Sequence, residues 1–236
     1  LSESGHGDAK HPNSARLDAY YIAFEDARRG DRDTIRDNLK EYLPRLQEVI
    51  DKVGEAGPIL DVGCGRGEWL ELIRDQGWQG KGIDINEVMV EDCREKSLDV
   101  IAADVIDYLR KQDDNSLVAI SGFHIIEHLP FEALYSLFEE ASRVLKPGGA
   151  ILFETPNPEN VLVGSHTFYH DPTHRNPITP TGIEFLASYV GLSQIDILRL
   201  HPYPEEAKVA GNDPLTERVN GHLCGPQDFA IFARKF

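Results

Sequence analysis

The stretch that decides the fold is ILDVGCGRGEWLELI, which runs from Ile59 to Ile73. Its opening run ILDV is typical of a buried strand, and its last six residues have the apolar spacing of a helix. Between the two stand Gly63, Gly65 and Gly67, which let a backbone approach a ligand closely. The amino terminus of the following helix favours negative charge. The stretch therefore predicts a strand, a ligand-binding turn and a helix.

Downstream of this stretch, short β-like runs alternate with helical patterns as far as residue 156. Such alternation predicts a parallel sheet with helices on both faces and a ligand beyond the carboxyl ends of its strands. Residues 193–202 and 227–236 read as a terminal hairpin at the sheet edge. Upstream, two helical patterns precede residue 54, with Pro44 breaking the second. We expect a disordered lead-in at 1–15, a helical lid at 16–54 and the main domain at 55–236.

The acidic composition argues against nucleic acid as a partner. The 236 residues carry 40 acidic and 24 basic side chains, a net charge of -16, and no basic cluster. Nucleic acid is therefore not an expected partner. No apolar run approaches the ~20 residues of a transmembrane helix, and no signal peptide is recognised. Three scattered cysteines predict no disulfide framework and a reducing compartment, the cytoplasm.

Two acids after the glycine turn, Asp84 and Asp104, stand at the ends of the next two predicted strands. The turn is spelled G-x-G-x-G rather than G-x-G-x-x-G, which weakens a nicotinamide dinucleotide interpretation without excluding it. Asp84 ends the next predicted strand, where a carboxylate could accept hydrogen bonds from both ribose hydroxyls. Asp104 and Val105 end the third strand, where an acid and a backbone N–H could face a purine edge.

Four segments in order, ILDVGCGRGEWLELI, GIDIN, AADV and RVLKPGGAILFETPNPEN, resemble the successive motifs of class I S-adenosylmethionine-dependent methyltransferases. The resemblance covers residues 57–160. It implies an α/β, Rossmann-like fold with a seven-stranded, mostly parallel sheet and an antiparallel edge. It also implies S-adenosylmethionine as cofactor and S-adenosylhomocysteine as product. By matching position, the implied cofactor-binding residues are Asp61, Gly63, Gly65, Gly67, Asp84, Ile85, Asp104, Val105 and Phe123.

The segment SGFHIIEHLP, residues 121–130, contains H-x-x-E-H, the spelling of an inverted zinc-protease motif. A zinc site would need a helix here, but only about six residues separate a buried strand from the next helix. We therefore expect a loop at the carboxyl edge. His128 is the first candidate for a general base and His124 the second, with Glu127 orienting a histidine. A helix-capping or carbonyl-binding role for either imidazole remains an alternative.

The connector at residues 157–180 is long and rich in polar and aromatic side chains, which predicts an acceptor pocket. A metal held by the 170–174 segment is an alternative, although Pro172 argues against the helix that it would need. We predict no metal site. The candidate acceptor-binding residues are Tyr169, His170, Asp171, His174 and Arg175.

Four further segments, YYIAFEDARRG, GFHIIEHLPFE, FETPNPENVLVG and FYHDPTHRNP, resemble bacterial methyltransferases of O-antigen and surface-polysaccharide assembly, including those that terminate chain growth. This narrower resemblance implies O-methylation of a terminal sugar, at a hydroxyl or an attached phosphate, with a lipid-linked or oligosaccharide glycan as acceptor. It also implies a kinase or glycosyltransferase module or partner, association with the inner membrane face through partners, and contact of Arg29 with the cofactor carboxylate. The alternatives are a phenol or quinol O-methyltransferase and a non-catalytic domain that binds S-adenosylmethionine.

Overall fold

The structure, a computed structural model, describes residues 30–236. The chain divides into two compact units, residues 1–41 and 42–236, which are considered separately. In the first unit, helix α2 (Arg32–Leu39) begins after Asp31, whose side chain accepts a hydrogen bond from the backbone N–H of Thr34. The predicted cofactor contact Arg29 and the lead-in at 1–15 lie outside the described residues.

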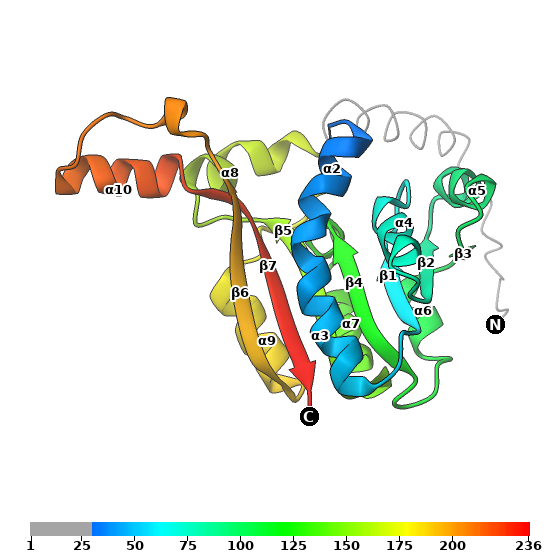
Figure 1. Ribbon diagram of the computed structural model, residues 1–236. Coiled ribbons are helices and arrows are strands. Elements are labelled where there is room, and N and C mark those ends of the chain that lie inside the picture. The colour runs from blue at the N-terminus through cyan, green and yellow to red at the C-terminus, as the bar shows by residue number, and fades with distance from the viewer. Residues whose placement is uncertain (1–29) are drawn as a thin grey trace, which may run out of the picture. The chain divides into compact units, whose positions relative to one another are not determined.

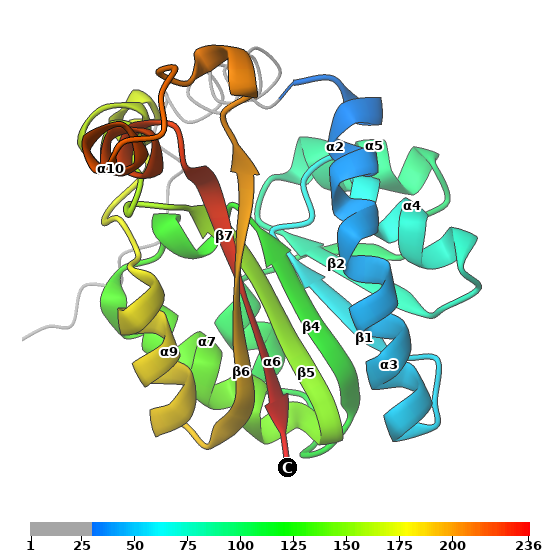
Figure 2. The same cartoon turned by 60° about the vertical axis from the view of Figure 1, so that its left-hand side comes forward.

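The second unit is built on a seven-stranded sheet with the order β3-β2-β1-β4-β5-β7-β6. Strands β1 to β5 are parallel, whereas β7 runs antiparallel to both β5 and β6 (Figure 2). The predicted fold class is therefore confirmed. The strands are β1 (Ile59–Val62), β2 (Gly80–Asp84), β3 (Val100–Ala102), β4 (Leu117–Phe123), β5 (Leu145–Pro156), β6 (Leu192–Pro202) and β7 (Pro226–Lys235).

Helices cover both faces of this sheet (Figures 1 and 2). One face carries α3 (Leu43–Val53), α4 (Glu68–Asp75) and α5 (Glu87–Glu95), and the other carries α6 (Val105–Leu109), α7 (Phe131–Val144) and α9 (Pro180–Tyr189). A short 3₁₀ turn, η1 (Lys40–Tyr42), separates α2 from α3, so the helix is divided as predicted, with Pro44 in the first turn of its second part.

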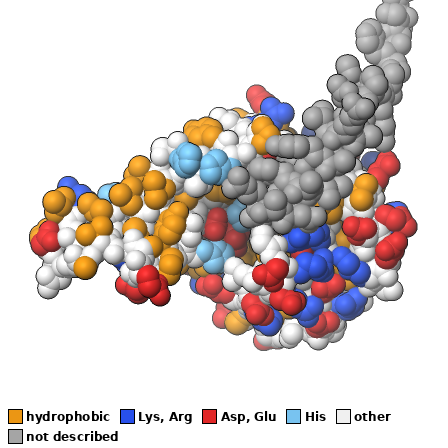
Figure 3. All heavy atoms as spheres, turned by 90° about the horizontal axis from the view of Figure 1, so that it is seen from above, with side chains coloured by type: hydrophobic (Ala, Val, Ile, Leu, Met, Phe, Trp, Pro, Cys, Tyr) orange, Lys and Arg blue, Asp and Glu red, His pale blue; other side chains and the backbone are white. Residues whose placement is uncertain are grey.

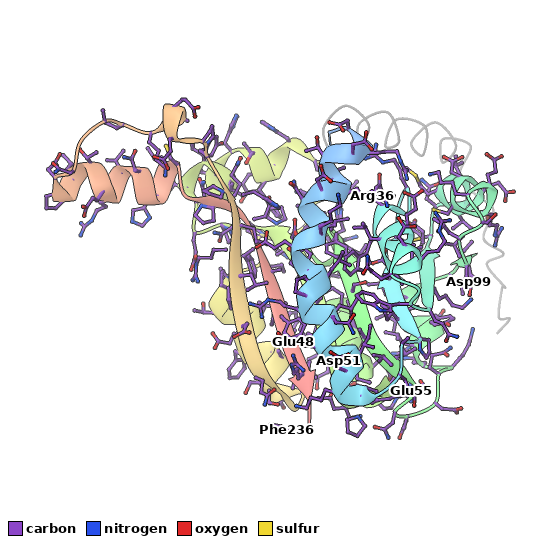
Figure 4. All side chains as sticks on the ribbon, in the orientation of Figure 1. Arg36, Glu48, Asp51, Glu55, Asp99 and Phe236 are labelled. Carbon is purple, nitrogen blue, oxygen red and sulfur yellow. The ribbon has the colours of Figure 1, made fainter. Side chains whose placement is uncertain are left out.

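Charged side chains tie α3 to the strands beneath it. Glu48 accepts from Arg234 of β7 at 3.1 Å, and Glu55 pairs with Lys146 of β5. Figure 4 labels both glutamates, Glu48 in this helix and Glu55 just beyond its end.

Short helical elements lie at the carboxyl edge of the sheet. They are η2 (Ile126–His128) after β4, and α8 (Val161–Ser165) and η3 (Thr167–His170) after β5. The long connection from β6 to β7 contains η4 (Glu205–Ala207) and α10 (Pro214–Leu223), a helix with no buried residue that extends away from the sheet (Figure 1).

The sheet is buried on both faces, so its central strands are almost continuously apolar; Val62, Ile83, Ile120 and Phe153 are at most 1% exposed. Buried polar side chains are the exception, and they mark the site. Asp61, Glu127, Glu154 and Thr155 are each at most 5% exposed and belong to β1, η2 and β5. In residues 30–236 no helix has both the length and the apolar composition to cross a bilayer.

Candidate active site

The glycine turn between β1 and α4 has a backbone that only glycine adopts easily. Gly63, Gly65 and Gly67 all have left-handed φ values, of 66°, 49° and 83°. A Cβ on Gly67 would lie 2.6 Å from a methyl carbon of Leu98, and one on Gly63 would lie 2.9 Å from Ile125. Side chains at Gly63 and Gly67 would therefore collide with the protein's own core.

Asp84, at the end of β2, is joined to this turn by hydrogen bonds. Its Oδ2 accepts from the N–H of Gly65 at 2.9 Å, and its Oδ1 accepts from the N–H of Asn86 at 2.8 Å. Each carboxylate oxygen can accept more than one hydrogen bond, so the same group can also receive the two hydroxyls of a ribose. The two backbone contacts fix its orientation for that role.

The other predicted cofactor residues line the same edge of the sheet. Ile85 follows Asp84 and is 80% exposed, so it offers an apolar surface to a flat ring. Asp104 caps α6 by accepting from the N–H groups of Ile106 and Asp107 at Oδ1, and Val105 opens that helix. Asp61 is buried in β1 and accepts from the hydroxyl of Ser121 at 2.9 Å.

A ring of charged side chains surrounds His124, which follows β4. Its Nδ1 lies 3.3 Å from Oε1 of Glu127 and its Nε2 lies 3.4 Å from Oε1 of Glu154. Burial lowers the pKa of His124, but the two nearby glutamates, aided by Asp228, hold that pKa well above its ordinary value. His124 also has a left-handed φ of 57°, a strained conformation for histidine that its N–H supports by donating to the carbonyl of Glu154 at 2.9 Å.

The two glutamates are themselves held by neighbours. Glu127 is fully buried and accepts from the hydroxyl of Thr155 at 2.9 Å, and Glu154 accepts from the hydroxyl of Tyr42. Burial raises the pKa of each glutamate, but the interaction with His124 outweighs it, so both pKa values lie below the ordinary range. His124 is therefore a protonated imidazole between two carboxylates.

His128 has different surroundings. Its Nδ1 lies 2.9 Å from the hydroxyl oxygen of Thr173, and that hydroxyl lies 2.6 Å from Oδ1 of Asp171. Because the Thr173 hydroxyl has a single proton to give to the carboxylate, the ring must donate from Nδ1, which leaves Nε2 as its acceptor nitrogen. Burial is the main cause of a lowered pKa for His128, although the charge of Glu127 opposes it. His128 is thus neutral near pH 7.

The predicted acceptor loop folds over η2 at several points. The backbone N–H of Arg175 donates to the carbonyl of Glu127 at 2.9 Å, and its Nε donates to the carbonyl of His128 at 3.1 Å. The ring of His174 lies 4.7 Å from that of His128, and its Nδ1–H donates to the carbonyl of Phe168 at 2.6 Å. The structure therefore brings Asp171, His174 and Arg175 to His128.

The other two loop residues lie in more exposed surroundings. Tyr169 is 61% exposed and packs on Phe168, while His170 pairs with His166.

Phe123 ends β4 and forms an aromatic cluster beside this ring of charges. Its ring lies 5.3 Å from that of Trp69 and 5.6 Å from that of Tyr42. Sequence reasoning named Phe123 but missed Tyr42, Glu154, His201 and Asp228, which come from distant elements and complete the polar network. Of these four residues, only Glu154 had a recognisable sequence signal, because it is an acid directly after the apolar run 150–153. Figure 3, a view onto the carboxyl edge, shows histidine and acidic side chains together there.

A seven-stranded sheet in this order, with a left-handed glycine turn after its first strand and an acid ending its second, defines the class I methyltransferases that use S-adenosylmethionine. The sequence profile of the methyltransferase domain family matches residues 28–195. The chain belongs to that family and is an enzyme that uses S-adenosylmethionine.

Solved structures and curated proteins that are similar to this chain are also methyltransferases. A SAM-dependent methyltransferase from Archaeoglobus fulgidus superposes with a TM-score of 0.84 at 34% identity, covering 92% of this chain and all of that one. The ubiquinone biosynthesis O-methyltransferase of Alkalilimnicola ehrlichii is 31% identical over 120 residues, 48% of each chain. That of Hydrogenovibrio crunogenus is 28% identical over 176 residues, 64% of this chain and 66% of the relative. The chain spans about half the length or less of the first curated relatives that it matches.

The residues present fit this cofactor. A turn that excludes side chains, a carboxylate oriented by two backbone N–H groups and an exposed Ile85 suit a methionyl chain, a ribose and an adenine in succession. The buried carboxylate of Asp61 suits an ammonium group.

Proposed function

We propose that this domain transfers the methyl group of S-adenosylmethionine to the oxygen of a small phenol or quinol acceptor, with His128 as the general base. The observation that carries the proposal is the chain of hydrogen bonds from Asp171 through Thr173 to His128. The curated relatives are named as O-methyltransferases of ubiquinone biosynthesis, which supports a ring hydroxyl as the acceptor.

His128 is suited to accept a proton from the acceptor. Asp171 and Thr173 hold its proton on Nδ1, so that Nε2 receives the hydroxyl proton as the oxygen attacks. The bound cofactor supplies a methyl group already activated on a sulfonium. The protein's remaining task is to align the nucleophilic oxygen with that methyl group, for which the rigid edge of β4 and η2 is suited.

The lowered pKa of His128 favours an acidic hydroxyl. A phenol has a pKa of about 10, whereas an aliphatic alcohol is far less acidic, closer to water at about 15.7. A weak imidazole base therefore assists a phenol more effectively than a sugar hydroxyl. His124 is the weaker candidate for the base because two carboxylates hold its proton.

The charges around the site argue against an anionic acceptor. Glu127, Glu154 and Asp228 surround His124, and Asp171 lies beside His128 through Thr173. A phosphate would be repelled by this set. A terminal sugar hydroxyl is the second candidate, supported by the polar loop and the exposed ring of Tyr169.

For the cofactor, we propose that Gly63, Gly65 and Gly67 contact the methionyl portion, Asp61 its ammonium and Asp84 the ribose. Ile85, Asp104 and Val105 would then contact the adenine, and the backbone at Phe123 would border the sulfonium. Three expectations stay predictions. They are closure of the cofactor site by the helical lid at 16–54, contact of Arg29 with the cofactor carboxylate, and a kinase or glycosyltransferase partner.

The test is an acceptor screen with radiolabelled S-adenosylmethionine against phenols, catechols and quinols, with oligosaccharides and phosphorylated sugars as the competing group. The proposal expects label in the phenolic set, lost in His128→Ala but retained in His222→Gln on α10. Methylation of sugars alone would refute the phenol assignment, and equal rates in wild type and His128→Ala would refute the base.

A further inference from the structure

A second cluster at the carboxyl edge has no part in the proposed proton transfer. Four side chains from four separate segments converge there. His124 follows β4, Glu154 lies on β5, His201 lies on β6 and Asp228 lies on β7. One ligand atom each of His124, Glu154 and Asp228 lie within 4.8 Å of one another.

The distances suit a single small ion. His124 Nε2 lies 3.4 Å from Oε1 of Glu154 and 3.9 Å from Oδ1 of Asp228. His201 Nδ1 lies 2.9 Å from Oδ2 of Asp228 and 3.9 Å from Oε1 of Glu154. Ligands bonded to zinc at about 2.0–2.2 Å are about 3.0–3.5 Å apart in tetrahedral or octahedral geometry. A small contraction would bring the ligand atoms of His124, Glu154 and Asp228 to such a shell, and His201 adjoins them through the other carboxylate oxygen of Asp228.

Two of these side chains, His124 and Glu154, contact a second residue that orients them, as metal ligands usually do. Glu127 faces Nδ1 of His124 at 3.3 Å, which directs Nε2 toward Glu154 and Asp228. Carboxylate–histidine–metal arrangements of this kind fix the ring and increase its basicity. Tyr42 donates to Oε2 of Glu154 and leaves Oε1 facing the histidines. Both sides of the cluster are therefore oriented toward a common point.

We propose that His124, Glu154, His201 and Asp228 form a binding site for one divalent transition-metal ion of the zinc or manganese kind. Two imidazoles with two carboxylates suit such ions, whereas magnesium and calcium prefer oxygen ligands alone. On binding, the ion takes the place of the proton on Nε2 of His124. The sequence predicted no metal because it considered only neighbouring residues, whereas these four are brought together by strand order.

A rival group of three, Glu127, His128 and His174, has ligand atoms similarly close together. Its His174 presents Nε2 to Glu127 at 3.9 Å, while Nδ1 donates to the carbonyl of Phe168. It also includes the histidine proposed as the base, which an ion would occupy. The four-residue cluster does not include that base.

The test is calorimetric titration of the chelator-treated protein with zinc chloride, together with the paramagnetic resonance spectrum of added manganese. We expect one ion per chain. His201→Gln and Asp228→Asn should each weaken binding by about tenfold or more. His222→Gln, on exposed α10, is the matched control and should bind as wild type, as should His174→Ala.

Circular dichroism melts decide whether each variant folds. If Asp228→Asn does not fold, His201→Gln on the edge strand decides alone. Absence of stoichiometric zinc and manganese binding would overturn the proposal. So would loss of binding in His174→Ala with wild-type binding in His201→Gln, because the ion would then lie in the rival group. Ion binding and methyl transfer are separate readouts, so failure of either proposal is distinguishable from failure of the other.

Discussion

Replacing Asp84 tests the cofactor site most directly, because its carboxylate has two structural tasks as well as its proposed ligand. The side chain accepts hydrogen bonds from the N–H groups of Gly65 and Asn86, so it orders the glycine turn that the cofactor would contact. Asp84→Ala removes these acceptors together with the partner of the ribose hydroxyls. Asp84→Asn keeps one carbonyl acceptor.

The expected magnitude follows from those bonds. Leaving two ribose hydroxyls without their partner costs about 1–3 kcal/mol, and loosening the turn adds about 1 kcal/mol. Asp84→Ala should therefore weaken S-adenosylmethionine binding by about 2–4 kcal/mol, or roughly 30- to 1000-fold. Asp84→Asn should lose about half of that free energy, since one backbone N–H keeps an acceptor.

The assay is calorimetric titration of S-adenosylmethionine and S-adenosylhomocysteine into each variant. Asp99→Asn is the matched control, because Asp99 precedes β3 and pairs with Lys81 at 2.6 Å on the surface (Figure 4). Wild-type affinity in Asp84→Ala, or an equal loss in the Asp99 control, would refute the assignment of the ribose to Asp84.

Further variants test the base, the glycine turn and the scaffold. His128→Ala should lower kcat roughly 100-fold at unchanged cofactor affinity. Because the pKa of His128 is lowered and a base must be unprotonated, wild-type kcat should fall only as pH drops below 6.5; a fall already complete at pH 7 would contradict this role. Gly67→Ala should abolish cofactor binding and lower Tm, since its Cβ meets Leu98 at 2.6 Å, whereas Gly77→Ala, with the same left-handed φ but open space, should cost only about 1–2 kcal/mol of stability. Arg143→Met should lower the unfolding free energy by about 1–3 kcal/mol in urea titration, because its guanidinium binds the carbonyls of Leu109 and Gln112, while cofactor affinity stays unchanged.

The fold was predictable because its signals are local. The glycine turn at 63–67 needs left-handed backbone, and the alternation of strand and helix patterns admits few topologies. The terminal pair of strands was also predicted, but not that β7 would insert between β5 and β6. That insertion depends on pairing between residues 150–156 and 228–234, which no local pattern reveals.

The site was predictable only where its residues are close in the sequence. His128, Asp171, His174 and Arg175 were named from two loops, and the structure brings them together. Thr173 was missed because a threonine in a polar loop gives no signal until its hydroxyl is seen between Asp171 and His128.

The sequence by itself determined the class of sheet, the position of the glycine turn and the acid at the end of the next strand, because each depends on residues within one strand–turn–helix unit or the strand after it. Only the tertiary structure decided the charge states of the histidines. His124 lies between carboxylates of η2 and β5, and His128 lies in a half-buried setting beside the acceptor loop, so two imidazoles four residues apart have pKa values shifted in opposite directions. Electrostatic surroundings are set by distance in space, and the folding of the sheet fixes those distances.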